Sequence, residues 1–311
     1  MGFKDKFLLG FWNVGVVESS IDDVFNNPNN MKIRWVRHRY RDRYFADPFL
    51  CDQDQKYYYV LVEEYIFYED KGKISRLTID KKTMKLVHKE LILNDNHHLS
   101  YPCIFDDYII PEGYRSGATY AYKKINGGES YQRIKLIDNA LIDPTLLKYD
   151  DRFWIFATTK ETPKDAVSKL SIFNSDQFGA FNPHENNPVK IDIKSARPSG
   201  NFFEYQGKLY RPAMDCEKTY GHRIRIMEVK KLSTQDYEEQ EVMVLPSKHP
   251  SPYNIGLHTF NVYENCIFVD GYGEYYSYLL KPCFVKLRKL LQLIFNRHDN
   301  KGKEIICELE I

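Results

Sequence analysis

Five short β-like segments of this chain each begin with a residue that can bind or polarise a ligand. The five residues are Asp47, Tyr101, Asp143, Arg197 and His258. They recur at intervals of 42 to 61 residues, and each is followed by a turn and then by a second apolar or aromatic run. Unequal repeats of strand, turn and strand are typical of β-propeller blades, whose innermost strands line a central channel. The pattern therefore predicts that the five residues converge on one site.

Carboxyl groups at such a site suit chemistry on a sugar. Glycosyl transfer or hydrolysis needs one carboxylate beside an oxocarbenium-like centre and a second group that moves a proton to or from oxygen. Asp47 fits the first role. Glutamates near the ends of the second runs fit the other role, so we expect the acid or base to be Glu63, Glu64 or Glu112.

Cationic side chains in the same repeats suit a phosphate or carboxylate group on the ligand, because they donate charge-assisted hydrogen bonds. Arg197, Arg211 and His258 are the expected donors. Together with polar residues of neighbouring segments, the predicted substrate-binding set is His98, Tyr101, Arg197, Arg211, Asp215, His258 and Asp270.

A structural interpretation competes with the catalytic one. Asp before Pro often begins a turn, and the two aspartates that precede proline could pair with Arg197 and Arg211, because an unpaired buried charge is costly. His97 and His98 could ligate a metal, but adjacent residues of a strand point to opposite faces. We therefore predict no metal site and no cofactor.

The elements that must position these residues form one all-β domain. Aromatic residues make up 15% of the chain, and aromatic side chains favour strands. The last blade ends near Tyr278 and is short, so we expect a strand from one chain end to complete it, since ring closure removes open sheet edges. The prediction is a five-bladed β-propeller over residues 1–280, with blades that begin at Asp47, His98, Ile142, Ala196 and Gly256.

An arginine-rich segment precedes the first blade. Residues Arg34 to Arg43 include five arginines and His38. Charge runs of this kind usually form solvated faces, so the segment is either an exposed loop or an anion clamp near the channel mouth.

The C-terminal tail, residues 281–311, has a different character. Lys281 to Arg297 combines basic residues with apolar residues at helical spacing, and it predicts a basic amphipathic helix. Its apolar positions are Phe284, Leu287, Leu291 and Ile294. Such a helix either lies on an anionic membrane surface or packs its apolar face against the propeller.

Composition narrows the partners and the compartment. The chain has 44 Lys and Arg against 43 Asp and Glu, a net charge of +1, so no chain-wide field attracts nucleic acid. Its six cysteines form no CxxC pair, and neither a signal-peptide pattern nor an apolar run of membrane-spanning length is present. We expect a cytoplasmic protein that acts at the inner face of the membrane on a sugar or sugar-phosphate ligand.

Several stretches resemble a known family. ADPF (46–49), HLSYPCIF (98–105) and DCEKTYGHRIRIMEV (215–229) are similar to the N-terminal domain of plant glucosamine inositolphosphorylceramide transferases. That family in turn resembles five-bladed furanosidases and fructosyl-transferring enzymes. The resemblance implies a carbohydrate-related role for residues 30 to 275. It also implies that Asp143 is a third catalytic acid, which orients the sugar and tunes the pKa of the acid.

Three functions are compatible with these observations. The first is a glycosyltransferase of cell-surface glycan biosynthesis that uses an activated, phosphate-bearing sugar donor and channel carboxylates. The second is a glycoside hydrolase of the furanosidase type. The third is a non-catalytic module that binds sugar for a partner transferase. Geometry separates them, because two carboxylates facing each other across a pocket favour chemistry, whereas acids tied to arginine favour binding or structure.

Overall fold

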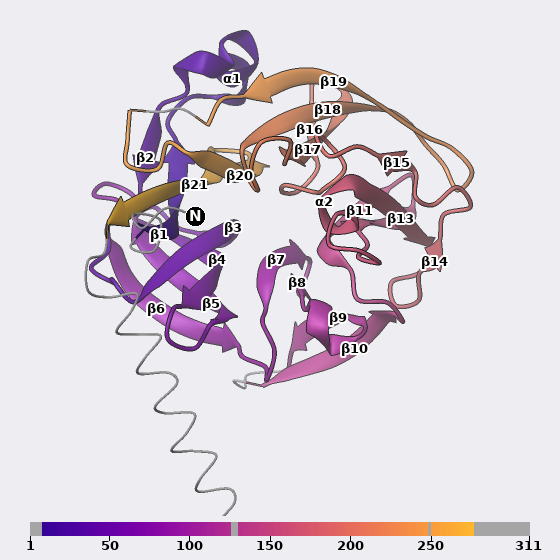
Figure 1. The fold of residues 1–311 in the computed structure, drawn as a ribbon, viewed down its shortest axis with the longest axis horizontal. Helices are drawn as coiled ribbons and strands as arrows, with labels where there is room; N and C mark the ends of the chain where they lie inside the picture. Colours follow the sequence, from indigo (N-terminus) through magenta and orange to yellow (C-terminus); the bar gives the residue numbers. More distant parts are fainter. Residues whose placement is uncertain (1–7, 126–129, 248–249, 277–311) are drawn as a thin grey trace, which may run out of the picture.

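A computed structural model describes residues 8–125, 130–247 and 250–276 of the 311-residue chain. The described residues form five antiparallel sheets arranged around a central axis, which confirms the five-bladed β-propeller (Figure 1). The predicted helix at Lys281 to Arg297 lies outside the described residues. Among the described residues, no helix has the length and apolar character needed to cross a membrane.

Four blades are built from consecutive strands. Blade 1 contains β3 (Arg43–Gln53), β4 (Tyr57–Ile66), β5 (Lys71–Asp80) and β6 (Leu86–Leu93). Blade 2 contains β7 (Ser100–Phe105), β8 (Tyr108–Glu112), β9 (Thr119–Lys124) and β10 (Tyr131–Ile137). Blade 3 contains β11 (Ile142–Tyr149), β12 (Arg152–Thr158), β13 (Lys169–Ser175), β14 (Asn182–Pro183) and β15 (Lys190–Ile191). Blade 4 contains β16 (Phe203–Tyr205), β17 (Lys208–Asp215), β18 (Arg223–Leu232) and β19 (Tyr237–Leu245).

Blade 5 joins the two ends of the described chain. Its strands are β20 (Gly256–Tyr263), β21 (Cys266–Tyr276), β1 (Leu8–Val17) and β2 (Ile33–Trp35). β1 pairs with β21 along its whole length, from Leu8 opposite Tyr276 to Val17 opposite Ile267. The N-terminal strand therefore closes the ring, as expected from the short last repeat, and covers the edge of β21.

Short helices connect some of the strands. They are α1 (Ile21–Asn26), η2 (Pro28–Asn30), η3 (Tyr114–Ser116) and α2 (Asp165–Ser168). A capping box begins α1: the Ser20 side chain accepts a hydrogen bond from the Asp23 backbone N–H, and the Asp23 side chain accepts one from the Ser20 N–H.

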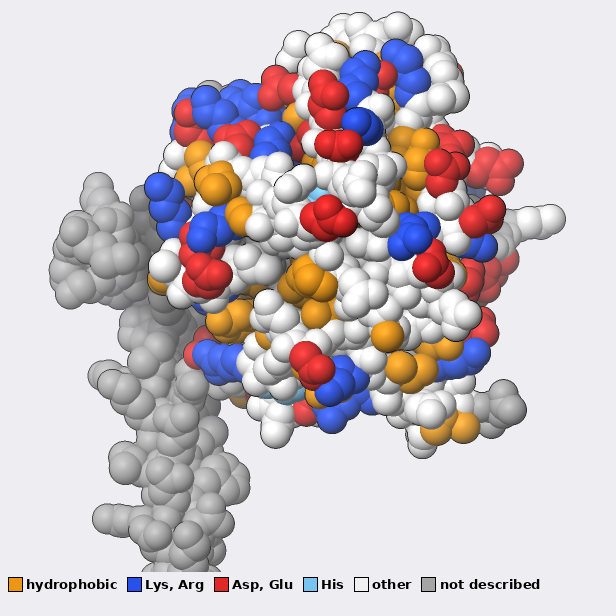
Figure 2. All heavy atoms as spheres, turned by 90° about the vertical axis from the view of Figure 1, so that its right-hand side faces the viewer, with side chains coloured by type: hydrophobic (Ala, Val, Ile, Leu, Met, Phe, Trp, Pro, Cys, Tyr) orange, Lys and Arg blue, Asp and Glu red, His pale blue; other side chains and the backbone are white. Residues whose placement is uncertain are grey.

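The apolar core is divided among the blade junctions. Five clusters of buried side chains occur among the described residues, and each one packs strands of two neighbouring blades together. Between blades 4 and 5, for example, Ile224 and Leu245 pack with Leu257 and Val269. On the side of the molecule shown in Figure 2, basic and acidic side chains are interspersed, in keeping with the small net charge.

The arginine-rich segment runs from β2 to β3 along the outer edge of blade 1. Arg37 pairs with Lys85 in a parallel bridge, and its carbonyl accepts the Leu86 N–H. This short stretch therefore covers part of β6, the outermost strand of blade 1. Arg43 begins β3, the innermost strand, so the segment crosses the blade from rim to centre.

Candidate functional site

The five residues that open the repeats lie together at the centre of the ring. All are buried. Asp47 accepts a hydrogen bond from the Tyr101 N–H at 3.0 Å, and Arg197 pairs with Asp143. His258 Nδ1 lies 3.8 Å from Asp47 Oδ1. The structure thus brings residues from five separate blades into one set of contacts, which we call the central cluster together with Glu63, Glu112, Tyr220 and Asp270.

A shared backbone feature positions three of these residues. Asp47, Tyr101 and Asp143 have φ values of 51°, 44° and 49°, in the left-handed region that side chains other than Gly, Asn and Asp rarely adopt. At each of them the pairing to the next strand shifts register, and a similar shift lies beside His258. Such conformations cost about 1–3 kcal/mol each and concentrate at functional sites. Because the left-handed conformation recurs in three blades despite this cost, we infer that it serves to orient the side chains of the central cluster.

Asp270 holds one side of the cluster together. Its Oδ2 accepts from the Asp47 N–H at 2.9 Å and from His258 Nδ1 at 2.7 Å. Its Oδ1 accepts from the N–H groups of His258 and Thr259. Burial opposes protonation of His258, but the charge of Asp270 raises the His258 pKa to about 9. His258 is therefore a cation at neutral pH, and the Trp12 ring stacks on it with 3.7 Å between centroids.

Asp47 itself lacks a full counter-charge. Its Oδ1 accepts a hydrogen bond from Thr259 Oγ1 at 3.1 Å. Burial raises the Asp47 pKa to about 7, although nearby His258 works in the opposite direction and Glu63 adds to the increase. A carboxyl group with this pKa exchanges its proton near neutral pH, which suits acid–base work.

Arg197 contacts the polar residues on the other side of the central cluster. Its Nε and Nη2 contact both oxygens of Asp143, at 2.5 Å and 3.2 Å, and Nη2 also donates to the Tyr220 hydroxyl. Glu112 Oε2 lies 3.6 Å from Arg197 Nη2 and accepts from the Asp143 N–H at 3.4 Å. Burial first, and then the charge of Asp143, raise the Glu112 pKa well above its ordinary value. Burial and the neighbouring Asp143 thus favour the protonated form of the Glu112 carboxyl group.

A cavity of about 440 Å³ opens beside Glu112 and His98. Its other lining residues include Tyr65, Tyr114 and Arg115. The Gly72 N–H donates to His98 Nδ1, so the His98 proton resides on Nε2, which faces Glu63 Oε1 at 3.2 Å. The cavity gives a ligand access to the Glu112 carboxyl group, whose pKa is raised, and to two exposed side chains, Tyr114 and Arg115.

Three predicted site residues lie elsewhere, in ion pairs within the blades. Glu64 contacts Arg43, Ser75 and Lys89, on the opposite face of β4 from Glu63. Arg211 is paired with Glu239, and Asp215 with Arg223 and Arg225. The structural interpretation of paired charges applies to these three residues.

The arrangement also includes residues that the sequence did not indicate as functional. Trp12 comes from the ring-closing strand β1, which belongs to no internal repeat. Tyr220 reads as part of a turn, yet its ring lies 5.1 Å from the Arg197 guanidinium and edge-on to His258. In the sequence, the Tyr-Gly pair at 220–221 is the one local feature that could have drawn attention to Tyr220.

Asp47, His258 and Asp270 offer atoms within 4.8 Å of one another, a spacing that a metal ion could bridge. However, both oxygens of Asp270 already accept two hydrogen bonds each. Internal hydrogen bonding therefore accounts for the grouping without an ion.

Comparisons with known proteins agree with the resemblance noted in the sequence. The family model for "Glucosamine inositolphosphorylceramide transferase 1, N-terminal" matches residues 22–254. The chain is 30% identical over 220 residues to glucosamine inositolphosphorylceramide transferase 1 of Oryza sativa subsp. indica, which is 65% of this chain and 28% of the rice protein. The corresponding Arabidopsis thaliana protein is 30% identical over 215 residues, 64% of this chain and 27% of that protein. The match thus spans less than a third of these relatives.

Solved structures with a similar arrangement include two glycoside hydrolases. A family 117 glycoside hydrolase of Zobellia galactanivorans has 11% identity and a TM-score of 0.48, covering 76% of this chain and 88% of that chain. The GH43_1 enzyme of Xanthomonas citri, complexed with xylotriose, has 9% identity and a TM-score of 0.47, covering 75% of this chain and 87% of that chain.

Proposed function

Because the chain belongs to the family of the N-terminal region of glucosamine inositolphosphorylceramide transferase 1, we propose that its central cluster binds a sugar and transfers a glycosyl group from an activated, phosphate-bearing donor. The observation that carries the proposal is a pair of carboxyl groups with raised pKa values, Asp47 and Glu112, on inner strands of neighbouring blades. Glycosyl chemistry requires two carboxyl groups of different protonation state.

In this proposal Glu112 is the acid. Its pKa is raised, it lines the cavity, and it is held near Arg197 and the Asp143 N–H by one oxygen only. It would donate its proton to the leaving oxygen, a step that typically contributes 10²–10⁴-fold in rate. Asp47, whose pKa is about 7, would supply the negative charge beside the oxocarbenium-like centre.

Arg197 has a positioning role in the proposal, because Asp143 and Tyr220 already occupy its donors. The donor phosphate is assigned to Arg115 instead. Arg115 lines the cavity, is exposed, and has no side-chain partner among the described residues. Tyr114, in the same cavity, offers an aromatic face for a sugar ring.

The decisive experiment compares the wild type with Glu112→Gln. Ligands are first found by thermal shift against sugar nucleotides and sugar phosphates, and transfer and free-sugar release are then measured. Gln has the shape of the protonated acid, so we expect turnover to fall by at least 100-fold while ligand affinity and the melting temperature are retained. Glu204→Gln, at an exposed position on β16, is the matched control. Full activity of Glu112→Gln would exclude Glu112 as the acid, and free-sugar release without transfer would favour a hydrolase.

Sugar binding without catalysis, in support of a partner transferase, is the second candidate. Its supporting observation is that each oxygen of Asp47 already accepts a hydrogen bond and that Asp143 is held by Arg197 at both oxygens. Acids occupied in this way can orient hydroxyl groups without reacting. This function predicts saturable ligand binding with no turnover in the wild type.

We further propose that the protein works at the inner face of a membrane, through the basic segment Lys281 to Arg297. Each basic residue near an anionic surface contributes about 1 kcal/mol, and salt screens it. Truncation before Lys281 should abolish co-sedimentation with anionic vesicles at low salt and leave propeller stability unchanged. Destabilisation on truncation, with no vesicle binding by the intact chain, would instead show that the segment packs on the propeller.

A further inference from the structure

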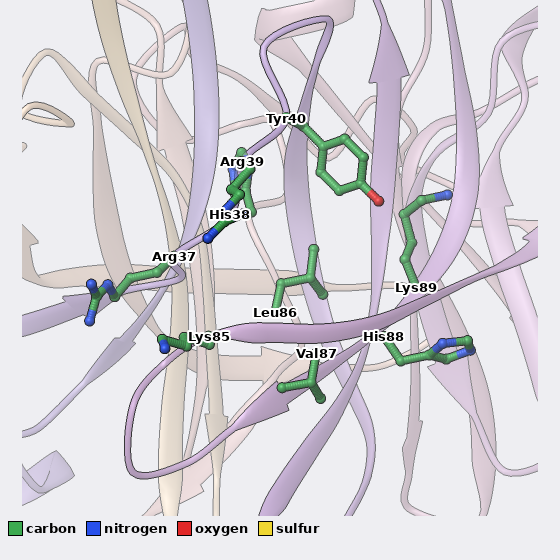
Figure 3. Close-up of a pocket in the computed structure, with 9 residues that line it drawn as sticks. All are labelled: Arg37, His38, Arg39, Tyr40, Lys85, Leu86, Val87, His88 and Lys89. Carbon is green, nitrogen blue, oxygen red and sulfur yellow. The ribbon is translucent and has the colours of Figure 1, made fainter.

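A second site lies on the outer edge of blade 1, away from the central cluster. The arginine-rich segment and β6 enclose a groove of about 730 Å³, shown in Figure 3. We call it the rim groove, and its charged and polar lining residues are Arg37, His38, Arg39, Tyr40, Lys85, His88 and Lys89. β6 is the outermost strand of blade 1, whereas the strand residues of the central cluster lie on the first or second strand from the centre of each blade. The rim groove is therefore independent of the proposed function.

Backbone pairing fixes the shape of the rim groove. The Arg37 N–H donates to the Met84 carbonyl, and the Leu86 N–H donates to the Arg37 carbonyl. These two hydrogen bonds hold the Arg37 and Lys85 backbones side by side in a parallel bridge. Two cationic side chains thus project from adjacent positions of a fixed backbone, and Arg39 follows two residues later on the same segment.

The charges of the rim groove are not balanced by acids. Within the part of the chain that the structure describes, the side chains of Arg37, Arg39 and Lys85 have no hydrogen-bond or ion-pair partner. Among the described residues, no acidic side chain lines the groove, and of the groove's cations Lys89 alone has a carboxylate partner, Glu64. Elsewhere many surface lysines are paired, for example Lys73 with Glu69. A concentration of unpaired cations repels itself and adds no stability.

His38 is a second feature of the rim groove that does not stabilise the fold. Its Nδ1 is buried and has no hydrogen-bond partner in the described part of the chain. Burial first, and then the charge of Arg41, lower the His38 pKa to about 4. A neighbouring cavity shares Arg37, His38 and Tyr40 with the rim groove and adds Arg41, so the positive region continues beyond it. An anion entering here would meet several cations at once.

We propose that the rim groove binds a phosphate group. Guanidinium groups donate paired hydrogen bonds that match phosphate oxygens, and the unpaired side chains of Arg37, Arg39 and Lys85 together suit a doubly charged anion. The Tyr40 hydroxyl and the exposed Val87 side chain complete the lining with a polar and an apolar contact. The phosphate is that of a free phosphate ester or of a lipid headgroup.

The test is a titration of the full chain with pyrophosphate by calorimetry at low salt. The variant Arg39→Glu/Lys85→Glu is compared with Lys124→Glu/Lys148→Glu, which makes the same charge change at exposed positions of blades 2 and 3. We expect saturable binding by the wild type and by the control, and at least a tenfold loss of affinity in the groove variant. Absence of wild-type binding, or equal loss in both variants, would overturn the proposal.

Two further arms complete the experiment. Arg39→Gln/Lys85→Gln removes the charges without adding repulsion, so unchanged affinity in this variant, with an unchanged melting temperature, would also overturn the proposal. Vesicles of phosphatidylcholine with phosphatidic acid then identify the source of the phosphate. Weaker vesicle binding by the groove variant than by the control assigns a lipid headgroup, and equal vesicle binding with lost pyrophosphate binding assigns a free phosphate ester.

Discussion

Two buried clusters of charged residues in this propeller have opposite electrostatic properties. In blade 4, Arg211 is 0% exposed and contacts both oxygens of Glu239 at 2.8 Å and 2.7 Å. Its remaining donors reach the carbonyls of Ser195 and Ala196. Burial opposes ionisation of Glu239, but the charge of Arg211 lowers its pKa to about 2. Lys190 of blade 3 also pairs with Glu239, at 2.8 Å, so the carboxylate of this blade 4 cluster has a full counter-charge.

The central cluster has more acids than cations. Its five carboxyl groups, on Asp47, Glu63, Glu112, Asp143 and Asp270, face one guanidinium, on Arg197, and one imidazolium, on His258. Burial first, and then the neighbouring carboxyl groups, raise the pKa values of Asp47 and Glu112. A matched buried network maintains a fold, whereas an unmatched one holds protons that can be exchanged, which is typical of functional sites.

The largest effect should follow from breaking the matched cluster. Arg211→Met leaves Glu239 buried without its main counter-charge, and we expect a loss of about 3–5 kcal/mol in the free energy of unfolding. Urea denaturation followed by circular dichroism measures it. The double variant Arg211→Met/Glu239→Met removes both charges and should recover most of the loss. A single-variant cost below about 1 kcal/mol would show that the pair is not structural.

Asp47→Asn should increase the free energy of unfolding at pH 8, whereas Arg211→Met should decrease it. The folded-state pKa of about 7 exceeds the ordinary value of an aspartate, so folding takes up a proton and wild-type stability falls as pH rises from about 4 to about 7. Asn cannot ionise, so the variant should be more stable than the wild type at pH 8, by about 1–4 kcal/mol, and similar at pH 4. Activity or ligand binding should nevertheless be lost.

The measurement is urea denaturation of both proteins from pH 4 to pH 8. Glu239→Gln provides the contrast, because a carboxyl with a lowered pKa stabilises the fold above its ordinary pKa and loses that contribution as pH falls toward 2. If Asp47→Asn were less stable than the wild type at pH 8, Asp47 would belong with the matched residues.

The sequence indicated the five opening residues of the central cluster because four of the five, Asp47, Tyr101, Asp143 and Arg197, stand directly before proline. X-Pro at Asp47, Tyr101 and Asp143 marks the left-handed residue and the register shift on three inner strands. The sequence could not show whether Glu63 or Glu64 belongs to the central cluster. Adjacent strand residues point to opposite faces, and the pairing of β4 with β3 decides which glutamate faces the cluster.

Two other features were beyond sequence reasoning for physical reasons. Arg197 and Arg211 are alike in type and lie in the same blade, but the partners that distinguish them, Asp143 and Glu239, are 54 and 28 residues away. Trp12 reaches His258 only through closure of the ring by β1. Contacts that depend on tertiary assembly leave no local pattern in the chain.

Removing one hydroxyl from each cluster gives the smallest effect and the finest comparison. The Tyr237 hydroxyl donates to Glu239 Oε2 within the blade 4 cluster, at 2.5 Å. The Tyr220 hydroxyl accepts from Arg197 at 3.2 Å, and the Tyr220 side chain is 50% exposed, so water can replace the lost contact. We expect Tyr237→Phe to cost about 1.5 kcal/mol, as for a hydrogen bond to a charged group, and Tyr220→Phe to cost less than about 0.5 kcal/mol.

The two variants should rank in the opposite order for ligand affinity, with the larger loss in Tyr220→Phe. Tyr220→Phe alters the surroundings of Arg197 and His258 and should weaken ligand binding severalfold, whereas Tyr237→Phe should leave it unchanged. Parallel urea denaturation and calorimetric titration of the two variants measure both properties. If the two tyrosines changed stability and affinity alike, charge matching would not distinguish a structural from a functional cluster in this propeller.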